Sequence, residues 1–186
     1  MTAENVNWAA ETAAAADGAG TFSHVTLSPK RLTAYIDVSK QLLVQDAIGV
    51  EQMIRQDIVN AINSKLEATI LGAAAGSSTQ PAGIFNGATY STVSNMEGIA
   101  NLEASVEAAN VLGDCKYILA PSAKAALRSM SKGENVAESL YSHGEIDGTP
   151  ALSTSHVAAN KMVYGDFSNL AIGQWGPIDL VVDNYT

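Results

Sequence analysis

The chain has 186 residues, of which 47% are hydrophobic and only 6% aromatic. This composition suits one globular domain or two small ones with a mainly aliphatic core, and it excludes a chain that is disordered overall. The formal net charge is −9, and the few Lys and Arg residues are scattered, which argues against a surface that grips nucleic acid through its phosphates.

Residues 1–20 are rich in Ala, Thr and Gly, and Trp8 is their only aromatic residue. Such a stretch does not offset its own ordering entropy, so we expect it to be flexible unless it lies on a neighbouring surface with Trp8 as its anchor. A chain-end tail without a role is an equally open alternative.

From Phe22 apolar and polar residues alternate, and after the break at Ser28-Pro29 the alternation continues to Val38. This pattern predicts two strand segments or one long bent ribbon.

The strongest helix signal runs from Asp46 to Ala75. Its isoleucines and leucines recur at helical spacing opposite polar and charged residues. A continuous helix over 47–74 would be about 40 Å long. Gly72 and Gly76 are expected to end it, and a loop and a short apolar insert follow.

The second half of the sequence predicts short helices and short strands. Ser94 and Glu97 have the spacing of a capping box at the start of a helix, and KYILA at 116–120 is typical of a buried strand. Pro121 is expected to start a helix that ends near Met130. Further strands are expected around residues 149–153, 161–165, 170–173 and 178–182. This mixture predicts an α+β fold class.

No set of residues predicts catalysis, a cofactor or a metal site. The three histidines lie in separate segments, at positions His24, His143 and His156. They have no metal-ligand spacing. Cys115 precedes an apolar strand, where an inert buried thiol is expected, and a single cysteine excludes a disulfide within these residues. The carboxylates Glu145 and Asp147 are explained by a solvated turn.

Several motifs follow one another in a defined order. They are WAAE at 8–11, TFSHVTLSPKRL at 21–32, VSKQLL at 38–43, LGAAAGSSTQPAGI at 71–84, KYILAPSAKAALRSM at 116–130, GTPALSTSHV at 148–157 and GDFSNLAIGQW at 165–175. Their collinear order resembles the major capsid protein family of tailed bacteriophages and prophages. The resemblance covers essentially the whole chain.

The resemblance implies the Hong Kong 97-type phage capsid fold. Residues 1–36 would form the returning half of an extended loop, and 37–95 a peripheral domain with a long spine helix at about 47–75. Residues 96–186 would form an axial domain of mixed sheet flanked by helices. Family members usually continue at both ends, so the resemblance also implies that this chain is a fragment. No residue pair for a crosslink between subunits can be placed, and we predict no crosslinking chemistry.

The resemblance implies a structural head subunit of the virion and not an enzyme. Its expected partners are copies of itself, as hexamers and pentamers in an icosahedral shell, and other phage head proteins. It would be assembled in the bacterial host cytoplasm and would enclose DNA without sequence-specific binding, which suits the negative charge; no membrane and no cofactor are implied. Candidate residues for contacts between subunits are Trp8, Phe22, Lys30, Arg31 and Tyr35.

Two alternatives remain open. An encapsulin-like compartment shell would have the same fold but enclose enzymes, although the TLSPKRL and QPAGI motifs favour the phage branch. A small α+β enzyme is less favoured. It would require a deep polar pocket that contains both a carboxylate and a histidine, either His143 or His156.

Overall fold

The structure is a computed structural model, and it describes residues 8, 11, 24–39, 41, 49–111, 113–179 and 181. The chain divides into two compact units, Met1–Pro29 with Gly173–Thr186, and Lys30–Ile172. This division follows contacts within one chain. The three segments 1–36, 37–95 and 96–186 therefore stay a prediction.

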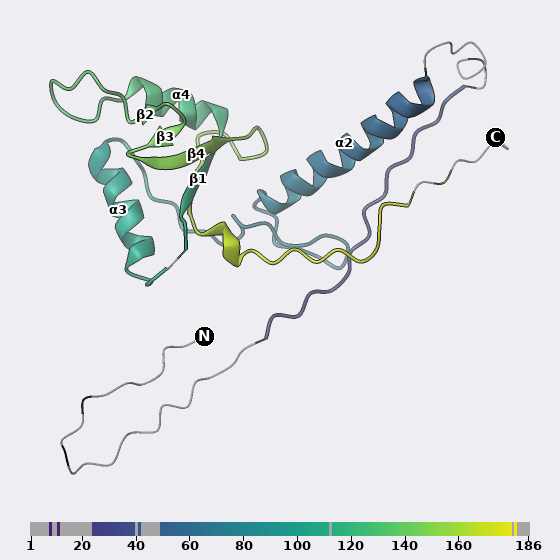
Figure 1. Cartoon of the computed structure of the whole chain (residues 1–186), viewed down its shortest axis with the longest axis horizontal. Coiled ribbons are helices and arrows are strands. Elements are labelled where there is room, and N and C mark those ends of the chain that lie inside the picture. Colours follow the sequence, from purple (N-terminus) through teal and green to yellow (C-terminus); the bar gives the residue numbers. More distant parts are fainter. Residues whose placement is uncertain are drawn as a thin grey trace. The chain divides into compact units, whose positions relative to one another are not determined.

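Among the described residues, the helices and strands lie in the unit Lys30–Ile172 (Figure 1). In chain order they are α2 (Val50–Ile70), α3 (Met96–Glu107), β1 (Lys116–Leu119), α4 (Pro121–Ser129), β2 (Tyr141–Ser142), β3 (Glu145–Ile146), β4 (Thr149–Ser153), β5 (Met162–Gly165) and a 3-10 helix (Phe167–Asn169). The predicted α+β class is confirmed. No helix among the described residues is long and apolar enough to cross a lipid bilayer.

The five strands form one mixed sheet in the order β2-β3-β4-β1-β5. The central strand β1 pairs in parallel with β4, where Tyr117 lies opposite Ala151. It pairs antiparallel with β5, where Tyr117 lies opposite Tyr164. Parallel neighbours need a long crossover connection, and here α4 and the strands β2 and β3 supply it.

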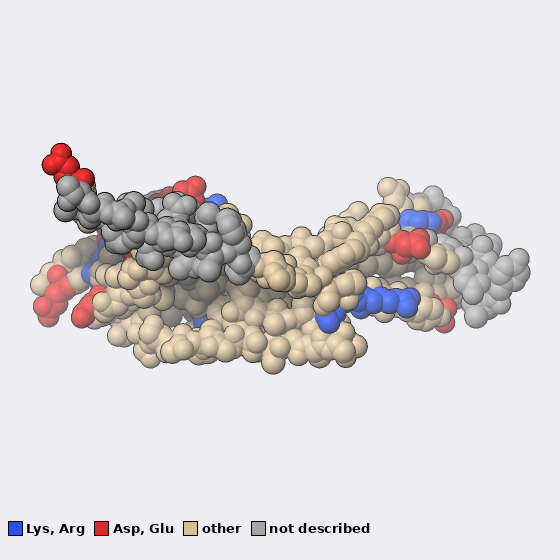
Figure 2. All heavy atoms as spheres, turned by 90° about the horizontal axis from the view of Figure 1, so that it is seen from below, with Lys and Arg blue, Asp and Glu red and all other residues tan. Residues whose placement is uncertain are grey.

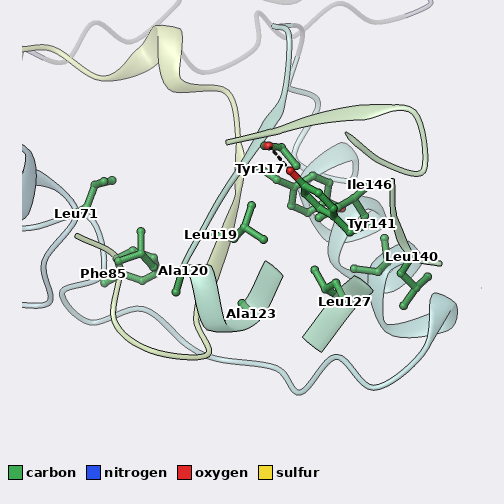
Figure 3. Packing of buried hydrophobic residues seen from close by; sticks show 13 residues of the cluster. Leu71, Phe85, Tyr117, Leu119, Ala120, Ala123, Leu127, Leu140, Tyr141 and Ile146 are labelled. Atoms are coloured by element: carbon green, nitrogen blue, oxygen red, sulfur yellow. Dashed lines mark hydrogen bonds between the residues drawn. The ribbon is translucent and has the colours of Figure 1, made fainter. Parts of the chain in front are cut away.

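The core includes residues of the sheet, of α3 and α4, and of the segment that follows α2 (Figure 3). It consists of Leu71, Phe85, Ile99, Tyr117, Leu119, Ala120, Ala123, Leu127, Leu140, Tyr141, Ile146, Ala151 and Val157. Aliphatic side chains dominate, as the composition predicts. Tyr117 is the largest fully buried side chain, and its ring centroid lies 4.6 Å from that of Tyr164. Its hydroxyl donates a hydrogen bond to Glu103 on α3 at 2.7 Å, which satisfies the buried polar group.

This buried tyrosine predicts a loss of stability at high pH. Burial, and then the hydrogen bond to Glu103, raise the pKa of Tyr117 well above its ordinary value, and burial also raises the pKa of Tyr164 to about 12. An unfolded tyrosine ionises near pH 10, whereas the folded one stays neutral, so the free energy of unfolding should fall as the pH rises above about 10. In urea titrations at pH 8, 10 and 11, Tyr117→Phe is expected to reduce this fall by about 1 kcal/mol per pH unit above pH 10. The exposed Tyr35→Phe is the control, and an equal reduction in both variants would contradict the prediction.

The segments predicted from continuous patterns are found close to the expected residues. KYILA supplies β1, the proline-started helix is α4, and β4 spans the predicted 149–153. The strand predicted at 161–165 is β5, which begins one residue later, at Met162. The predicted helix after residue 94 is α3, but its N-cap is Asn95 and not Ser94. The Asn95 side chain accepts a hydrogen bond from the Gly98 N–H at 3.0 Å, and Asn and Ser are comparable caps, so the sequence alone did not decide between them.

Helix α2 is shorter than the predicted 47–75. It begins at Val50, because the preceding Gly49 has a left-handed backbone with φ of 85°, and residues 42–48 lie outside the described residues. It ends at Ile70, because the following chain turns back on the helix end. The Ile84 N–H donates to the Ile70 carbonyl at 2.8 Å, and the Phe85 N–H donates to the Gly72 carbonyl at 3.1 Å. Glycine at 72 therefore marks the helix end, and the continuation to residue 75 was wrong.

Three of the predicted strands are absent from the residues that the structure describes in those segments. Residues 24–39 of the expected ribbon and residues 170–173 adopt no strand, and the described residues 178, 179 and 181 adopt none either. Residues 21–23, 180 and 182 lie outside the described part. Alternation of apolar and polar residues makes a strand only where a second strand pairs with it, and within one described chain these segments have no such partner.

The two hairpins that join β2, β3 and β4 were not predicted from the sequence, which indicated only a solvated turn around Glu145 and Asp147 before the strand at 149–153. Two pairs of turn residues have positive φ, His143 at 51° with Gly144 at 92°, and Asp147 at 48° with Gly148 at 85°. Positive φ at both central residues is the signature of type I′ hairpin turns, for which Asp-Gly is a favoured pair. The Asp147-Gly148 dipeptide was therefore a signal for the hairpin.

Gly148 gives a prediction about the hairpin between β3 and β4. A Cβ at this position meets no atom within 4 Å, so a substitution there tests backbone conformation alone. Gly148→Ala is expected to lower the free energy of unfolding by about 1 kcal/mol, because an L residue resists positive φ. Gly165→Ala is the matched control, because Gly165 also has open space but no positive φ. Urea unfolding followed by circular dichroism measures both, and a loss of equal size would show that strain at Gly148 is absent.

Candidate subunit interface

The residues predicted to contact other subunits are exposed wherever the structure describes them. Lys30, Arg31 and Tyr35 share one segment, in which the Tyr35 side chain is 84% exposed. The Lys30 Nζ donates a hydrogen bond to the Ser78 carbonyl at 3.1 Å, so it links this segment to the loop after α2. Trp8 is fully exposed and belongs to the other unit. Phe22 lies outside the described residues.

The unit Met1–Pro29 with Gly173–Thr186 contains no buried residue among those described. Its exposed large apolar side chains are Trp8, Val25, Leu27, Trp175, Ile178 and Val181. Within it, a Cβ built at Gly173 would lie 3.1 Å from Leu27, so the chain segments touch without enclosing a core. Exposed apolar surface of this kind marks a site of protein contact.

Helix α2 also has no buried residue along its 21 residues. Its isoleucines Ile54, Ile58 and Ile62 are half-buried, whereas Met53 and Leu66 are exposed. One side of the helix is held by polar contacts to the loop after β4. Thr154 Oγ1 donates to Glu67 Oε1 at 2.7 Å, and Ser64 Oγ lies 3.3 Å from His156 Nε2. A helix this long is stabilised mainly by packing, so its apolar face has room for a further partner.

A cavity of about 340 Å³ lies beside the C-terminal end of α2. Most of its lining is apolar or small and includes Leu71, Phe85 and Tyr90, and His156 and Lys161 contribute nitrogen-bearing side chains. The Lys161 Nζ lies 3.6 Å from the centroid of the Tyr90 ring, a cation–π contact. None of the lining residues carries a carboxylate; Glu67, whose Oε2 is 3.8 Å from His156 Nε2, lies outside the lining.

A second hollow, of about 430 Å³, has the opposite character. It is lined by Glu107, Asp114, Cys115, Lys116 and Tyr164 among others, and by no histidine. Burial, and then a hydrogen bond with Cys115, raise the pKa of Tyr164, whose hydroxyl therefore stays neutral near pH 7. The Cys115 thiol beside it is half-buried. Neither hollow therefore combines a histidine with a carboxylate in its lining, as the enzyme alternative requires. Among the described residues no group of three or more His, Cys, Asp or Glu side chains could hold a metal ion.

The face drawn in Figure 2 has no continuous patch of Lys and Arg, the feature expected of a nucleic-acid-binding surface, among the residues that the structure describes. Its Lys and Arg side chains lie in separate spots, interspersed with Asp and Glu, and most of the described surface is uncharged. Exposed ion pairs such as Arg55 with Glu51, at 2.6 Å on α2, contribute only about 0.3–0.5 kcal/mol each. The surface available for contacts on this face is therefore mainly uncharged.

The whole chain, residues 1–186, matches the model of the phage capsid family. It belongs to this family. The resemblance that the collinear motifs indicated is thus confirmed, and so is the structural rather than enzymatic class, because the phage capsid family consists of structural proteins of the virion.

A curated relative shows the same relationship at a distance. The chain is 25% identical over 188 residues to the major capsid protein of Halomonas phage phiHAP-1, an alignment that covers 98% of this chain. It covers 31% of that protein, so the chain spans about a third of the length of its relative. Membership of the phage capsid family implies the Hong Kong 97-type fold, and the α+β architecture with a mixed sheet agrees with it at that coarser level.

Sequence reasoning found exposed residues of the candidate interface but missed the cavity. Its lining comes from three separate segments, 71–73, 85–90 and 155–161. The apolar insert with Phe85 was the one signal in the sequence, and it did not indicate that Tyr90 and Lys161 lie beside it.

Proposed function

We propose that this chain is the shell-forming region of a phage major capsid subunit, which associates with copies of itself in an icosahedral shell. The observation that carries the proposal is the unit Met1–Pro29 with Gly173–Thr186, in which no described residue is buried although several are large and apolar. Burial of apolar surface contributes about 25 cal/mol per Å², so such a unit gains its stability when another surface covers it. A repeated subunit supplies that surface from its neighbours.

Within this proposal the three segments of the chain have separate roles. Residues 1–36 form part of an extended loop that lies on a neighbouring subunit, and residues 37–95 form a peripheral domain with α2 as its spine. Residues 96–186 form the axial domain around the sheet. Two observations support this: α2 has no buried residue, and the five strands found among the described residues lie between residues 116 and 165.

The proposed contacts between subunits use Trp8, Phe22, Lys30, Arg31 and Tyr35. Hexamers and pentamers of the subunit, together with other phage head proteins, would complete the shell in the bacterial cytoplasm and in the virion. The net charge of −9 suits an inner wall that encloses DNA without binding its sequence, because like charges limit adhesion to the packed phosphates.

Electron microscopy of particles formed by the complete reading frame tests this function. We expect closed polyhedral shells, and we expect nuclease-resistant DNA inside particles from phage-producing cells. Protein cargo in place of DNA would instead indicate a compartment shell. A protein that stays monomeric under assembly conditions, with the other phage head proteins supplied, would contradict the proposal.

A further inference from the structure

The cavity beside α2 combines an aromatic wall with a positive rim. The rings of Phe85 and Tyr90 are nearly parallel, with an interplanar angle of 15° and centroids 6.4 Å apart, and Lys161 lies over Tyr90. Tyr90 is 49% exposed, so this wall is open to another molecule. Since no carboxylate lines the cavity, its chemistry fits an aromatic side chain that has a negative charge close by.

The segment of residues 24–39 presents that combination of groups. It forms neither helix nor strand, and its part from residue 30 to residue 39 follows an extended path (Figure 1). In an extended backbone, side chains two residues apart lie on the same side, about 7 Å from each other. Tyr35 and Asp37 therefore offer an aromatic ring and a carboxylate together, whereas Ile36 points to the other side.

Neither group has a partner among the residues of its own chain that the structure describes. Tyr35 is 84% exposed and so does not fill a cavity of the same molecule. Among the described residues no hydrogen bond or ion pair involves the Asp37 side chain. Because this chain carries a net charge of −9, two copies of it repel overall, and a local pair of opposite charges favours one contact between them over others.

We propose that Tyr35 of one copy inserts into this cavity of a second copy, where its ring packs on Tyr90 and Asp37 pairs with Lys161. The inference rests on the proposed self-association and adds to it a defined contact. In this contact the exposed segment of one copy binds a cavity that is already formed in the other copy. The pair of opposite charges fixes how the segment is oriented in the cavity.

Photo-crosslinking in assembled particles of the complete protein tests this contact. Tyr35→p-benzoylphenylalanine keeps an aromatic ring at the position, and copies with the probe are assembled with ¹⁵N-labelled copies without it. Mass spectrometry is expected to find crosslinks from residue 35 of a probe copy to segments 71–90 or 155–161 of a labelled copy. The matched control is a probe at Ile36, for which we expect at least tenfold fewer crosslinks to these segments.

Charge exchange tests the pairing separately. Asp37→Lys and Lys161→Asp are each expected to lower the crosslink yield from residue 35 at least tenfold, and the two changes together are expected to restore it. Asp37→Lys lies on the exposed segment and leaves the cavity intact, so its effect does not depend on how the cavity tolerates Lys161→Asp. Particles that form normally but crosslink residue 35 elsewhere, or equally from residue 36, overturn the contact and leave the proposed function standing. If the unmodified protein forms no particles, the proposed function fails and this contact fails with it.

Discussion

Leu119→Ala is expected to lower the free energy of unfolding by about 3 kcal/mol, in the range measured for leucines removed from well-packed cores. Leu119 is 0% exposed and lies on β1, the strand that pairs with both β4 and β5. Its neighbours are held in register by the sheet and do not collapse freely into the space left by the side chain. Urea denaturation followed by circular dichroism measures the loss. With a total stability of about 5–15 kcal/mol for a domain, this variant would be markedly less folded at 37 °C.

Leu152→Ala is the matched control on the adjacent strand. Leu152 pairs with Ile118 in the parallel register but is 61% exposed, so the same chemical change removes little buried surface. We expect its effect on the free energy of unfolding to stay within about 0.5 kcal/mol. Equal losses for the two leucines would contradict the burial of Leu119 and the exposure of Leu152. The comparison also separates core packing from a general effect of leucine on strand formation.

The elements that sequence reasoning predicted well are those whose signals are local. The strand β1 is a short apolar run, and Pro121 directly after it is a residue type favoured in the first turn of a helix, so both boundaries follow from residues next to each other. The end of α2 and the fate of residues 24–39 depend on segments distant in sequence. Ile84 turns back to bond the Ile70 carbonyl, and an alternating segment forms a strand only if another strand lies beside it.

The candidate interface also has a part that could be predicted from the sequence and a part that could not. Tyr35, Lys30 and Arg31 could be named in advance because the motifs around them are collinear with a known family, and their exposure agrees with an external partner. The cavity could not be named, because Tyr90 and Lys161 meet only after β5 has joined β1 and the loop before it has been placed. A cation over an aromatic ring leaves no periodic trace in the sequence. Contacts between distant segments are therefore what the structure adds.

Gly83→Ala is expected to destabilise the chain by about 3 kcal/mol, at the upper end of the usual cost of overpacking. Gly83 is buried where the chain returns to the end of α2. A Cβ there would collide with the Gly72 carbonyl and lie 2.9 Å from the Thr69 oxygen, both of which are backbone groups. These groups have little freedom to move, because the Ile84 and Phe85 N–H groups donate to the carbonyls of Ile70 and Gly72. Thermal or urea unfolding, read from helical circular dichroism, measures the effect.

Gly87→Ala in the same loop separates this collision from ordinary backbone strain. Gly87 has a φ of +69°, but a Cβ there meets no atom within 4 Å. We therefore expect a loss of only about 1 kcal/mol, the cost of holding an L residue at positive φ. If Gly83→Ala costs no more than Gly87→Ala, the close approach of the two backbones is not maintained in solution. If it costs clearly more, the helix end and the aromatic wall are fixed by one contact, because Gly83 precedes Phe85 by two residues. The loss should then extend to the crosslink between copies, which requires Phe85 and Tyr90 to stay in place.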